Sequence, residues 1–353
     1  MEVSTPVITE EIKQYRRQMA HFIYGNWIHQ VTYVFAELGL ADAFVNGPQS
    51  LEQLAEFGEV KAPILKRVLR GTFELTYLTF DVETQLYHLT EFGAMLGTDH
   101  PYSMREEARL NGADYRYQPW GNLIKILRNG VKNEYSPTVE HGSLDYLKDK
   151  PELLATFHNT LHQKSKIENA SIVKDYDFGQ FSSVMDIGGG LGTFIMSILD
   201  VNPDIEGHLF ELEATLDFEM PEKYEGRLHK SPGDFFVDVP GTADAYTMKN
   251  VIHNWPEDKV IMILKSVCEA MKKTHEIGTD PSKKRLLIVE NLLAEDDTPK
   301  LATWMDLNFM VIIDGAEHTL EEYRTIGRQA GLELAEVTET SVGRHVLAFA
   351  IAE

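Results

Sequence analysis

Apolar residues recur along the chain with two different periods, and the change of period divides the sequence near residue 175. From Glu10 to Val45 the apolar positions follow a helical spacing and are rich in aromatic side chains: Phe22, Ile23, Trp27, Val31, Val34, Phe35 and Leu38. Side chains this apolar on a helix are expected to bury against another surface. After residue 175 short apolar runs alternate with helical segments, which is typical of a mostly parallel sheet covered by helices.

The N-terminal hundred residues predict three helices followed by a hairpin. Ser50 and Gln53 are spaced as a capping box for a helix over 51–57, and an amphipathic helix is expected over 62–78. Two short alternating runs, 78–82 and 85–89, then predict a hairpin. This order of elements is that of a winged-helix unit. Because the chain is acidic, we expect the unit to serve dimerisation rather than DNA binding.

Six strands are expected in the C-terminal half, over residues 183–187, 207–211, 227–230, 243–248, 285–290 and 344–351. The helices predicted outside this half cover 119–130 and 144–170, with Pro151 at a helix start. The sequence therefore predicts an α/β fold. A Rossmann-like domain over 176–353 would follow a winged-helix dimerisation domain over 1–110 and a helical linker and substrate cover over 111–175. Ligands of such sheets bind at the carboxyl ends of the strands.

A run of glycines breaks the first strand of this domain. Asp186 opens a D-x-G-x-G-x-G turn that contains Gly188, Gly190 and Gly192. Residues without a Cβ let the backbone come close to a ligand, and a turn between a strand and a helix is where α/β sheets bind nucleotide-like molecules. A tight turn without any ligand is the alternative interpretation.

The strand predicted over 207–211 helps to identify the ligand of the glycine turn. It ends at Glu211, a position that accepts hydrogen bonds from ribose hydroxyls in Rossmann-like units, although a solvated charge at a strand end would look the same. Ile195 stands where a dinucleotide motif has its third glycine, which argues against NAD. The turn suits a ligand with adenosine but without phosphates, such as S-adenosylmethionine.

Polar residues also follow the later strands. His253 comes just after the fourth strand, and an imidazole can take a proton from a phenol at neutral pH. Glu290 ends the next strand, where a buried carboxylate needs a partner such as a histidine. Glu317 precedes a helix over 320–330, and its alternative role is a charge favoured at a helix start. Asp234 and Phe235, after Gly233, could bind an adenine amine and ring.

Composition excludes several classes of protein. The chain has 353 residues and a formal net charge of −22, which disfavours nucleic acid as a partner. It has no apolar run long enough to span a bilayer, and its start lacks the features of a signal peptide. The one cysteine, Cys268, is expected in the core and fits a reducing compartment. We therefore expect a soluble, cytoplasmic protein that binds neither nucleic acid nor membrane.

In their order along the chain, these motifs resemble the S-adenosylmethionine-dependent O-methyltransferases of the plant caffeate and bacterial hydroxyneurosporene type. The resemblance covers nearly the whole chain. It implies cofactor-binding roles for Asp186, Gly188, Gly190, Glu211, Leu212, Gly233, Asp234, Phe235, Lys249 and Trp255. It implies that His253 is the general base and that Glu290 and Glu317 flank it. It implies that Met305 and Asp306 line the acceptor pocket, under a helical cover that includes Trp120 and His141. Independently of the resemblance, the aromatic side chains of Trp120 and Phe309 suggest an aromatic acceptor.

The same resemblance implies a homodimer in which the helix around 21–30 reaches into the partner's pocket. The acceptor would be a hydroxyl of a small, aromatic or secondary-metabolite molecule. Three alternatives stay open: a relative that binds S-adenosylmethionine but acts as a pericyclase, decarboxylase or hydroxylase; a metal-assisted C-methyltransferase; and a winged-helix regulator that senses a ligand.

Two positions depart from the family pattern. Asn254 follows the histidine where the family usually has aspartate, and an amide supplies no charge. His318 stands where an arginine is usual. A histidine there, close to His253 and to carboxylates, could form a metal site, and the alternative is a polar residue near a helix start.

Overall fold

The computed structural model describes residues 8–130, 132–139, 142–273, 283–296, 298 and 301–352. The chain divides into two compact units. The first consists of Met1–Tyr117 and Pro151–Thr160, and the second consists of Gln118–Lys150 and Leu161–Glu353. Within the described residues, no helix has the length and apolar character needed to cross a bilayer.

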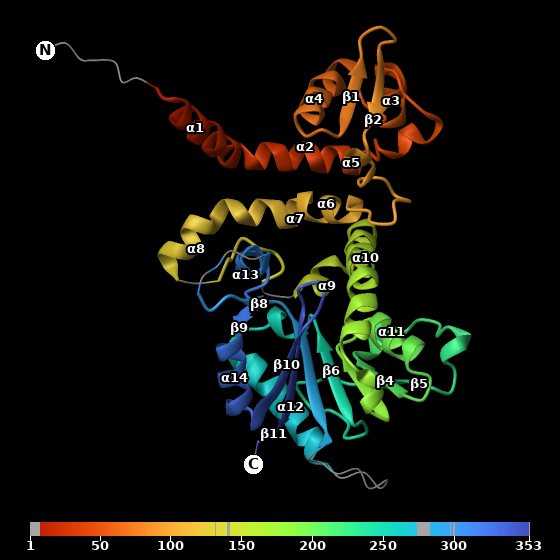
Figure 1. Ribbon diagram of the computed structural model, residues 1–353, viewed down its shortest axis with the longest axis vertical. Coiled ribbons are helices and arrows are strands. Elements are labelled where there is room, and N and C mark those ends of the chain that lie inside the picture. Colours follow the sequence, from red (N-terminus) through yellow and green to blue (C-terminus); the bar gives the residue numbers. More distant parts are fainter. Residues whose placement is uncertain are drawn as a thin grey trace, which may run out of the picture. The chain divides into compact units, whose positions relative to one another are not determined.

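The first unit has the order of elements expected of a winged helix. Three helices and a hairpin form this unit (Figure 1). They pack around a core that includes Phe35, Leu54, Leu69 and Leu78. Its elements are α1 (Glu10–Ile23), α2 (Gly25–Glu37), η1 (Asp42–Asn46), α3 (Leu51–Phe57), α4 (Ala62–Glu74), β1 (Leu78–Asp81), β2 (Leu86–Leu89), α5 (Glu91–Ala94), α6 (Arg105–Gly112) and α7 (Asp114–Tyr117). The predicted capping box at Ser50 is confirmed.

The aromatic N-terminal helices are buried less than their pattern suggested. Phe35 and Ala36, at the end of α2, are fully buried. Phe22, Ile23 and Trp27 are 65%, 65% and 62% exposed, so within one chain these large apolar side chains remain uncovered. The pattern predicts a helix correctly but cannot say which surface covers it.

The second unit is built on a seven-stranded sheet in the order β10-β11-β7-β6-β3-β4-β5. Its strands are β3 (Ser183–Ile187), β4 (Glu206–Glu211), β5 (Leu228–Pro232), β6 (Ala245–Lys249), β7 (Arg285–Glu290), β10 (Leu332–Glu339) and β11 (His345–Ile351). The six predicted strands are confirmed within two residues at each end. We missed β10, an edge strand that pairs antiparallel with β11. Its alternation of apolar and polar residues was the available signal.

Helices cover both faces of this sheet (Figure 1). One face packs against α11 (Thr193–Val201) and the end of α10 (Pro151–Asp175) through Ile172, Ile195 and Leu209. The other packs against α12 (Glu257–Lys272) and α14 (Leu320–Gln329), where Cys268 is buried as predicted. The remaining elements are η2 (Gln118–Asn122), α8 (Leu123–Asn129), α9 (Gly142–Leu147), η3 (Phe178–Gln180), η4 (Glu213–Leu216), η5 (Glu222–Tyr224), η6 (Ile252–Asn254), β8 (Leu292–Leu293), α13 (Leu301–Ile312) and β9 (His318–Thr319).

The order of strands reverses beside β3. The chain runs from β3 outward to β4 and β5, then returns to β6 on the other side of β3. In open α/β sheets such a reversal leaves a crevice at the carboxyl ends of the strands, and ligands bind there. Asp186 on β3 and Thr247 on β6 are register partners at this point, so the fold brings the glycine turn next to the loop that carries His253.

Candidate functional site

The glycine turn adopts a backbone conformation that L side chains resist. Gly188, Gly190 and Gly192 have φ values of +68°, +58° and +75°. A Cβ on Gly188 would lie 3.1 Å from the Val251 side chain, whereas nothing lies within 4 Å of one built on Gly190. The turn therefore leaves open space beside Gly190, where a ligand can meet the backbone.

Asp186 is buried near the end of β3, and only one of its two carboxyl oxygens has a hydrogen-bond partner. Its Oδ1 accepts a hydrogen bond from the Thr247 hydroxyl at 2.8 Å, while its Oδ2 is buried without a partner. Burial raises the pKa of Asp186 to about 7, against the lowering effect of the Thr247 hydroxyl and the Lys249 charge. A buried carboxyl oxygen without a partner fits a cationic group of a ligand, whose charge would favour the ionised form. S-adenosylmethionine carries both an ammonium and a sulfonium.

Glu211 is aimed at the glycine turn. Its Oε2 accepts a hydrogen bond from the Gly190 N–H at 3.1 Å and its Oε1 accepts one from the Leu212 N–H at 2.8 Å. Gly233 lies on the next strand end, and its N–H donates to the Glu211 carbonyl at 3.0 Å. A Cβ on Gly233 would lie 2.4 Å from the Phe210 ring, so this position requires glycine. The predicted ribose-binding carboxylate is thus held beside the turn by backbone donors.

The remaining predicted cofactor residues make two separate sets of contacts. Asp234 accepts a hydrogen bond from the Phe236 N–H, and Phe235 packs edge-on against Trp255 with ring centroids 6.1 Å apart. Lys249 is 5% exposed at its side chain and forms an ion pair with Glu168 at 3.1 Å. The donor set and the open glycine turn fit S-adenosylmethionine. The pairing of Lys249 with Glu168 is a contact that the sequence did not reveal.

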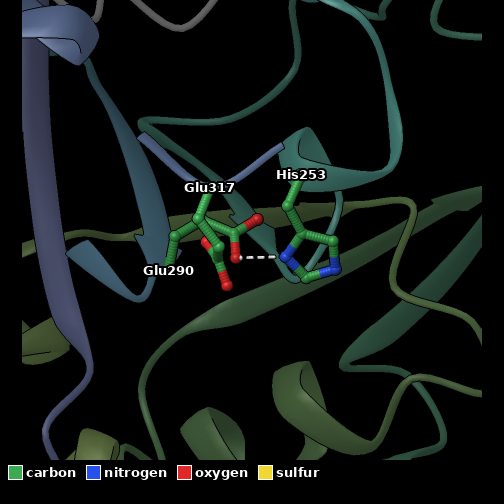
Figure 2. Close-up of side chains that lie close together, drawn as sticks. All are labelled: His253, Glu290 and Glu317. Carbon is green, nitrogen blue, oxygen red and sulfur yellow. Dashed lines mark hydrogen bonds and ion pairs between the residues drawn. The ribbon is translucent and has the colours of Figure 1, made fainter. Parts of the chain in front are cut away.

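His253, Glu290 and Glu317 converge in the interior (Figure 2). The His253 Nδ1 lies 2.7 Å from the Glu290 Oε2, and the other carboxylate oxygen of Glu290 accepts the Ile252 N–H at 3.2 Å. Burial lowers the pKa of His253, but the charge and hydrogen bond of Glu290 outweigh it, so the pKa is raised. The carboxylate fixes the ring and leaves Nε2 for other chemistry.

Glu317 completes the group and is held by its loop. Its Oε1 accepts a hydrogen bond from the Asn291 amide at 3.0 Å, and its N–H donates to the Asp306 Oδ1 at 3.0 Å. The loop is tied to the histidine by the Ala316 N–H, which donates to the His253 carbonyl at 3.1 Å. Burial, followed by the Glu290 charge, raises the pKa of Glu317 to about 7.

One aromatic side chain, that of Phe309, lies over the imidazole. Phe309 stacks on His253 with ring centroids 4.3 Å apart and an interplanar angle of 17°. Trp120 donates from its indole nitrogen to the Asn308 Oδ1 at 3.3 Å, which places it against the same helix, α13. Met305, on α13, is partly buried. His141 lies outside the described residues.

The two departures from the family pattern have different structural settings. The Asn254 amide donates to the backbone carbonyls of Asn250 and Val251 at 2.9 and 3.2 Å, bonds that an aspartate could not make. His318 is buried, with its Nδ1 3.9 Å from a Glu322 oxygen. In the part of the chain that the structure describes, the group of side chains spaced to hold a metal ion is His253, Glu290 and Glu317, and His318 is not part of it.

Several residues at the site were missed. Thr247, Asn291 and Asn308 each bond a predicted site residue. Thr247 is a polar residue inside an otherwise apolar strand, which was a usable signal. Asn291 and Asn308 lie in segments whose pattern offers no such signal, as do Glu168 and Arg344.

The chain is similar to several known proteins. The family profile of the O-methyltransferase domain matches residues 120–333. The phenazine O-methyltransferase PhzM of Lysobacter antibioticus is 31% identical over 333 residues, which are 93% of this chain and 94% of that protein. The mitomycin biosynthesis 6-O-methyltransferase of Streptomyces lavendulae is 29% identical, over 88% of this chain and 87% of that protein. The solved structure of the mitomycin 7-O-methyltransferase MmcR superposes with a TM-score of 0.85 at 26% identity, over 96% of this chain and 98% of that chain.

Proposed function

Because the chain belongs to the S-adenosylmethionine-dependent O-methyltransferase family, we propose that it transfers a methyl group to a hydroxyl of a small aromatic acceptor, with His253 as the general base. That it is a methyltransferase with S-adenosylmethionine as cofactor follows from the family. The observation that carries the catalytic proposal is the buried hydrogen bond of 2.7 Å between the His253 Nδ1 and Glu290.

The cofactor supplies an activated methyl group on a sulfonium sulfur, so little chemistry is left for the protein. The glycine turn and Glu211 would hold it, with Asp186 as the acidic partner for its positive charge. Leu212, Asp234, Phe235, Lys249 and Trp255 would complete the pocket. The protein's main tasks are then to orient the acceptor hydroxyl and to exclude water, which are large contributions when two reactants must meet in line.

His253 has the setting that a general base requires. Its Nδ1 is occupied by Glu290, so Nε2 is the nitrogen that accepts the hydroxyl proton; Figure 2 shows the ring nitrogen that bears no dashed line turned away from the carboxylates. Glu290 stabilises the imidazolium that forms, and Glu317 adds a second carboxylate. Proton transfer of this kind contributes about 10²- to 10⁴-fold to rate.

The nature of the acceptor is supported by the lining of the site. Phe309 stacks on the imidazole, so a flat aromatic surface borders the base, and Trp120 contacts the same helix, α13. Met305 and Asp306 come from the same helix. Several relatives carry names that state O-methylation of aromatic compounds, including a phenazine and 3-amino-4-hydroxybenzoate. A phenolic hydroxyl is therefore the acceptor we propose.

We also propose a cytoplasmic homodimer in which residues 1–110 form the dimerisation domain and 111–175 cover the substrate of the domain over 176–353. The exposed Phe22, Ile23 and Trp27 support it, because large apolar side chains that stay uncovered in one chain favour a protein partner. Light scattering after gel filtration tests the dimer. A mass near 40 kDa, that of the single chain, would contradict it.

The chemistry is tested with methyl-labelled S-adenosylmethionine and a panel of phenols, aromatic amines and aromatic carboxylic acids. We expect label to appear as an aryl methyl ether. Label on nitrogen or carbon would contradict O-methylation. Decarboxylation or oxidation of an acceptor without label transfer would show that the bound cofactor serves as a fixed positive charge instead.

A further inference from the structure

A chain of buried ion pairs lies next to the proposed base. Glu168 on α10 accepts two hydrogen bonds at its Oε1 from Arg344, at 3.2 Å from Nε and 2.8 Å from Nη2. The Oε2 of Glu168 lies 3.1 Å from the Lys249 ammonium. The side chains of Lys249, Glu168 and Arg344 are only 5%, 18% and 12% exposed. Burying a charged side chain costs desolvation free energy, so three buried charged side chains in contact suggest a functional role.

The fold places Arg344 beside Glu290. His345 is the register partner of Glu290 across the β11–β7 pair, so Arg344 lies one residue beyond the end of β7. Its backbone carbonyl accepts two hydrogen bonds from Thr340, which fixes the turn before β11. Its Nη1 is buried without a hydrogen-bond partner. One nitrogen of the guanidinium therefore makes no hydrogen bond, although it lies near the carboxylates that flank His253.

We propose that Arg344 is a positioning residue of the methyl-transfer reaction: anchored on Glu168, its fixed positive charge offsets the two carboxylates beside His253 and keeps the imidazole free to accept a proton. The proposal rests on the proposed role of His253. Arg344 touches neither cofactor nor acceptor in it, and acts through Glu290 and Glu317.

Charge balance supports this role. Without a counter-charge, two carboxylates beside one imidazole would hold a proton on it, and a protonated His253 cannot act as a base. The Arg344 charge lowers the pKa of His253 and of Glu317, and the charges of Glu290 and Glu317 in turn raise the pKa of Arg344. With the imidazole neutral and the three carboxylates ionised, the group of Lys249, Glu168, Arg344, Glu290, Glu317 and His253 carries one negative charge, and accepting the proton brings it to zero.

Other polar groups face this cluster but cannot replace the guanidinium. The Tyr323 hydroxyl is buried, and the neighbouring carboxylates raise its pKa beyond what burial does, so it stays neutral. Burial lowers the pKa of His318, and burial raises the pKa of Asp306. Phe309 covers the open face of the His253 ring with an apolar surface. Of the two cations in this cluster, Lys249 and Arg344, it is Arg344 whose charge lowers the pKa of His253.

The test is the pH dependence of kcat/KM for the acceptor at saturating cofactor. R344Q should move the acid limb upward by about 1 pH unit, so that activity lost at pH 7 returns at higher pH. R344K should stay close to wild type because it keeps the charge. R328Q is the matched control, since Arg328 pairs with Glu321 and Glu333 at the surface and is 53% exposed.

R344Q leaves the Glu168 carboxylate buried with one partner fewer, and the variant could fold poorly for that reason alone. The double variant R344Q/E168Q removes both charges. It should keep most of the upward shift, because Arg344 is the member of the pair whose charge acts on His253. Equal loss of activity at every pH in both variants would show a purely structural role and overturn the proposal.

A second measurement does not depend on turnover. The imidazole protons of histidine-labelled protein are titrated by NMR, and the His253 signal is identified by its loss in H253N. The pKa of His253 should rise by about 1 unit in R344Q and stay unchanged in R328Q. An unchanged pKa in R344Q would overturn the inference. If the wild type transfers no methyl group to any acceptor, the proposed function fails while this titration still decides the electrostatic role of Arg344.

Discussion

Replacing Asp186 with asparagine should stabilise the cofactor-free protein progressively as the pH rises. The side chain is 1% exposed, and its Oδ2 has no hydrogen-bond partner. Burial raises its pKa to about 7 from the ordinary value of 3.8. Because the folded-state pKa lies above the unfolded one, the neutral carboxyl stabilises the fold below pH 4, and this contribution is lost as the pH rises to about 7.

The size of the effect follows from the shift. About 3 pKa units correspond to roughly 4 kcal/mol of lost stability above pH 7, and to less than half of that at pH 5. Asparagine stays neutral and keeps an oxygen for the Thr247 hydroxyl. The difference in unfolding free energy, D186N minus wild type, should therefore grow by roughly 2–3 kcal/mol between pH 5 and pH 8.

Urea unfolding followed by far-ultraviolet circular dichroism at pH 5, 6, 7 and 8 measures this difference. D204N is the matched control, because Asp204 is exposed and should show no such growth. Calorimetry should also show at least a tenfold loss of affinity for S-adenosylmethionine in D186N. A stability difference that does not change with pH would refute the reasoning, because it would mean that Asp186 ionises freely in the folded protein.

Three further changes probe the loop contacts around the base. N254D removes two hydrogen bonds to backbone carbonyls, so thermal unfolding should show a loss of about 1–2 kcal/mol; unchanged stability would contradict a structural role for the amide. In G315A the new Cβ would lie 2.0 Å from the His253 carbonyl oxygen, so methyl transfer should fall at least tenfold while cofactor affinity measured by calorimetry is kept. F309L removes the ring stacked on His253, and kcat should fall about tenfold; an unchanged kcat would show that the stack is only packing.

The site residues that the sequence could predict are those at the ends of strands. Glu211 and Glu290 end apolar strands and Asp186 is the last residue but one of another. A parallel sheet brings such ends to one edge, so the topology alone predicts that they group there. His253 became a candidate because it follows the end of β6 by four residues. Short apolar runs indicate which segments are buried strands, and this was enough to predict the strands of the central sheet.

Ion pairs between residues far apart in the sequence could not be predicted in the same way. Glu168 lies on a helix of low amphipathic character and Arg344 in a turn, and nothing in their local patterns indicates that they meet. Lys249 was expected at the cofactor, and its ion pair with Glu168 depends on a contact 81 positions away along the chain. His318 was considered for a metal site with His253, but its imidazole packs against Tyr323 instead.

The most direct test of the account is methyl transfer by H253N at saturating S-adenosylmethionine, measured with the labelled cofactor on an acceptor that the wild type methylates. Asparagine fits the buried position but cannot take up the proton. We predict a rate lower by a factor of about 10² to 10⁴, with cofactor affinity unchanged. A rate within tenfold of wild type would contradict the assignment of His253 as the base.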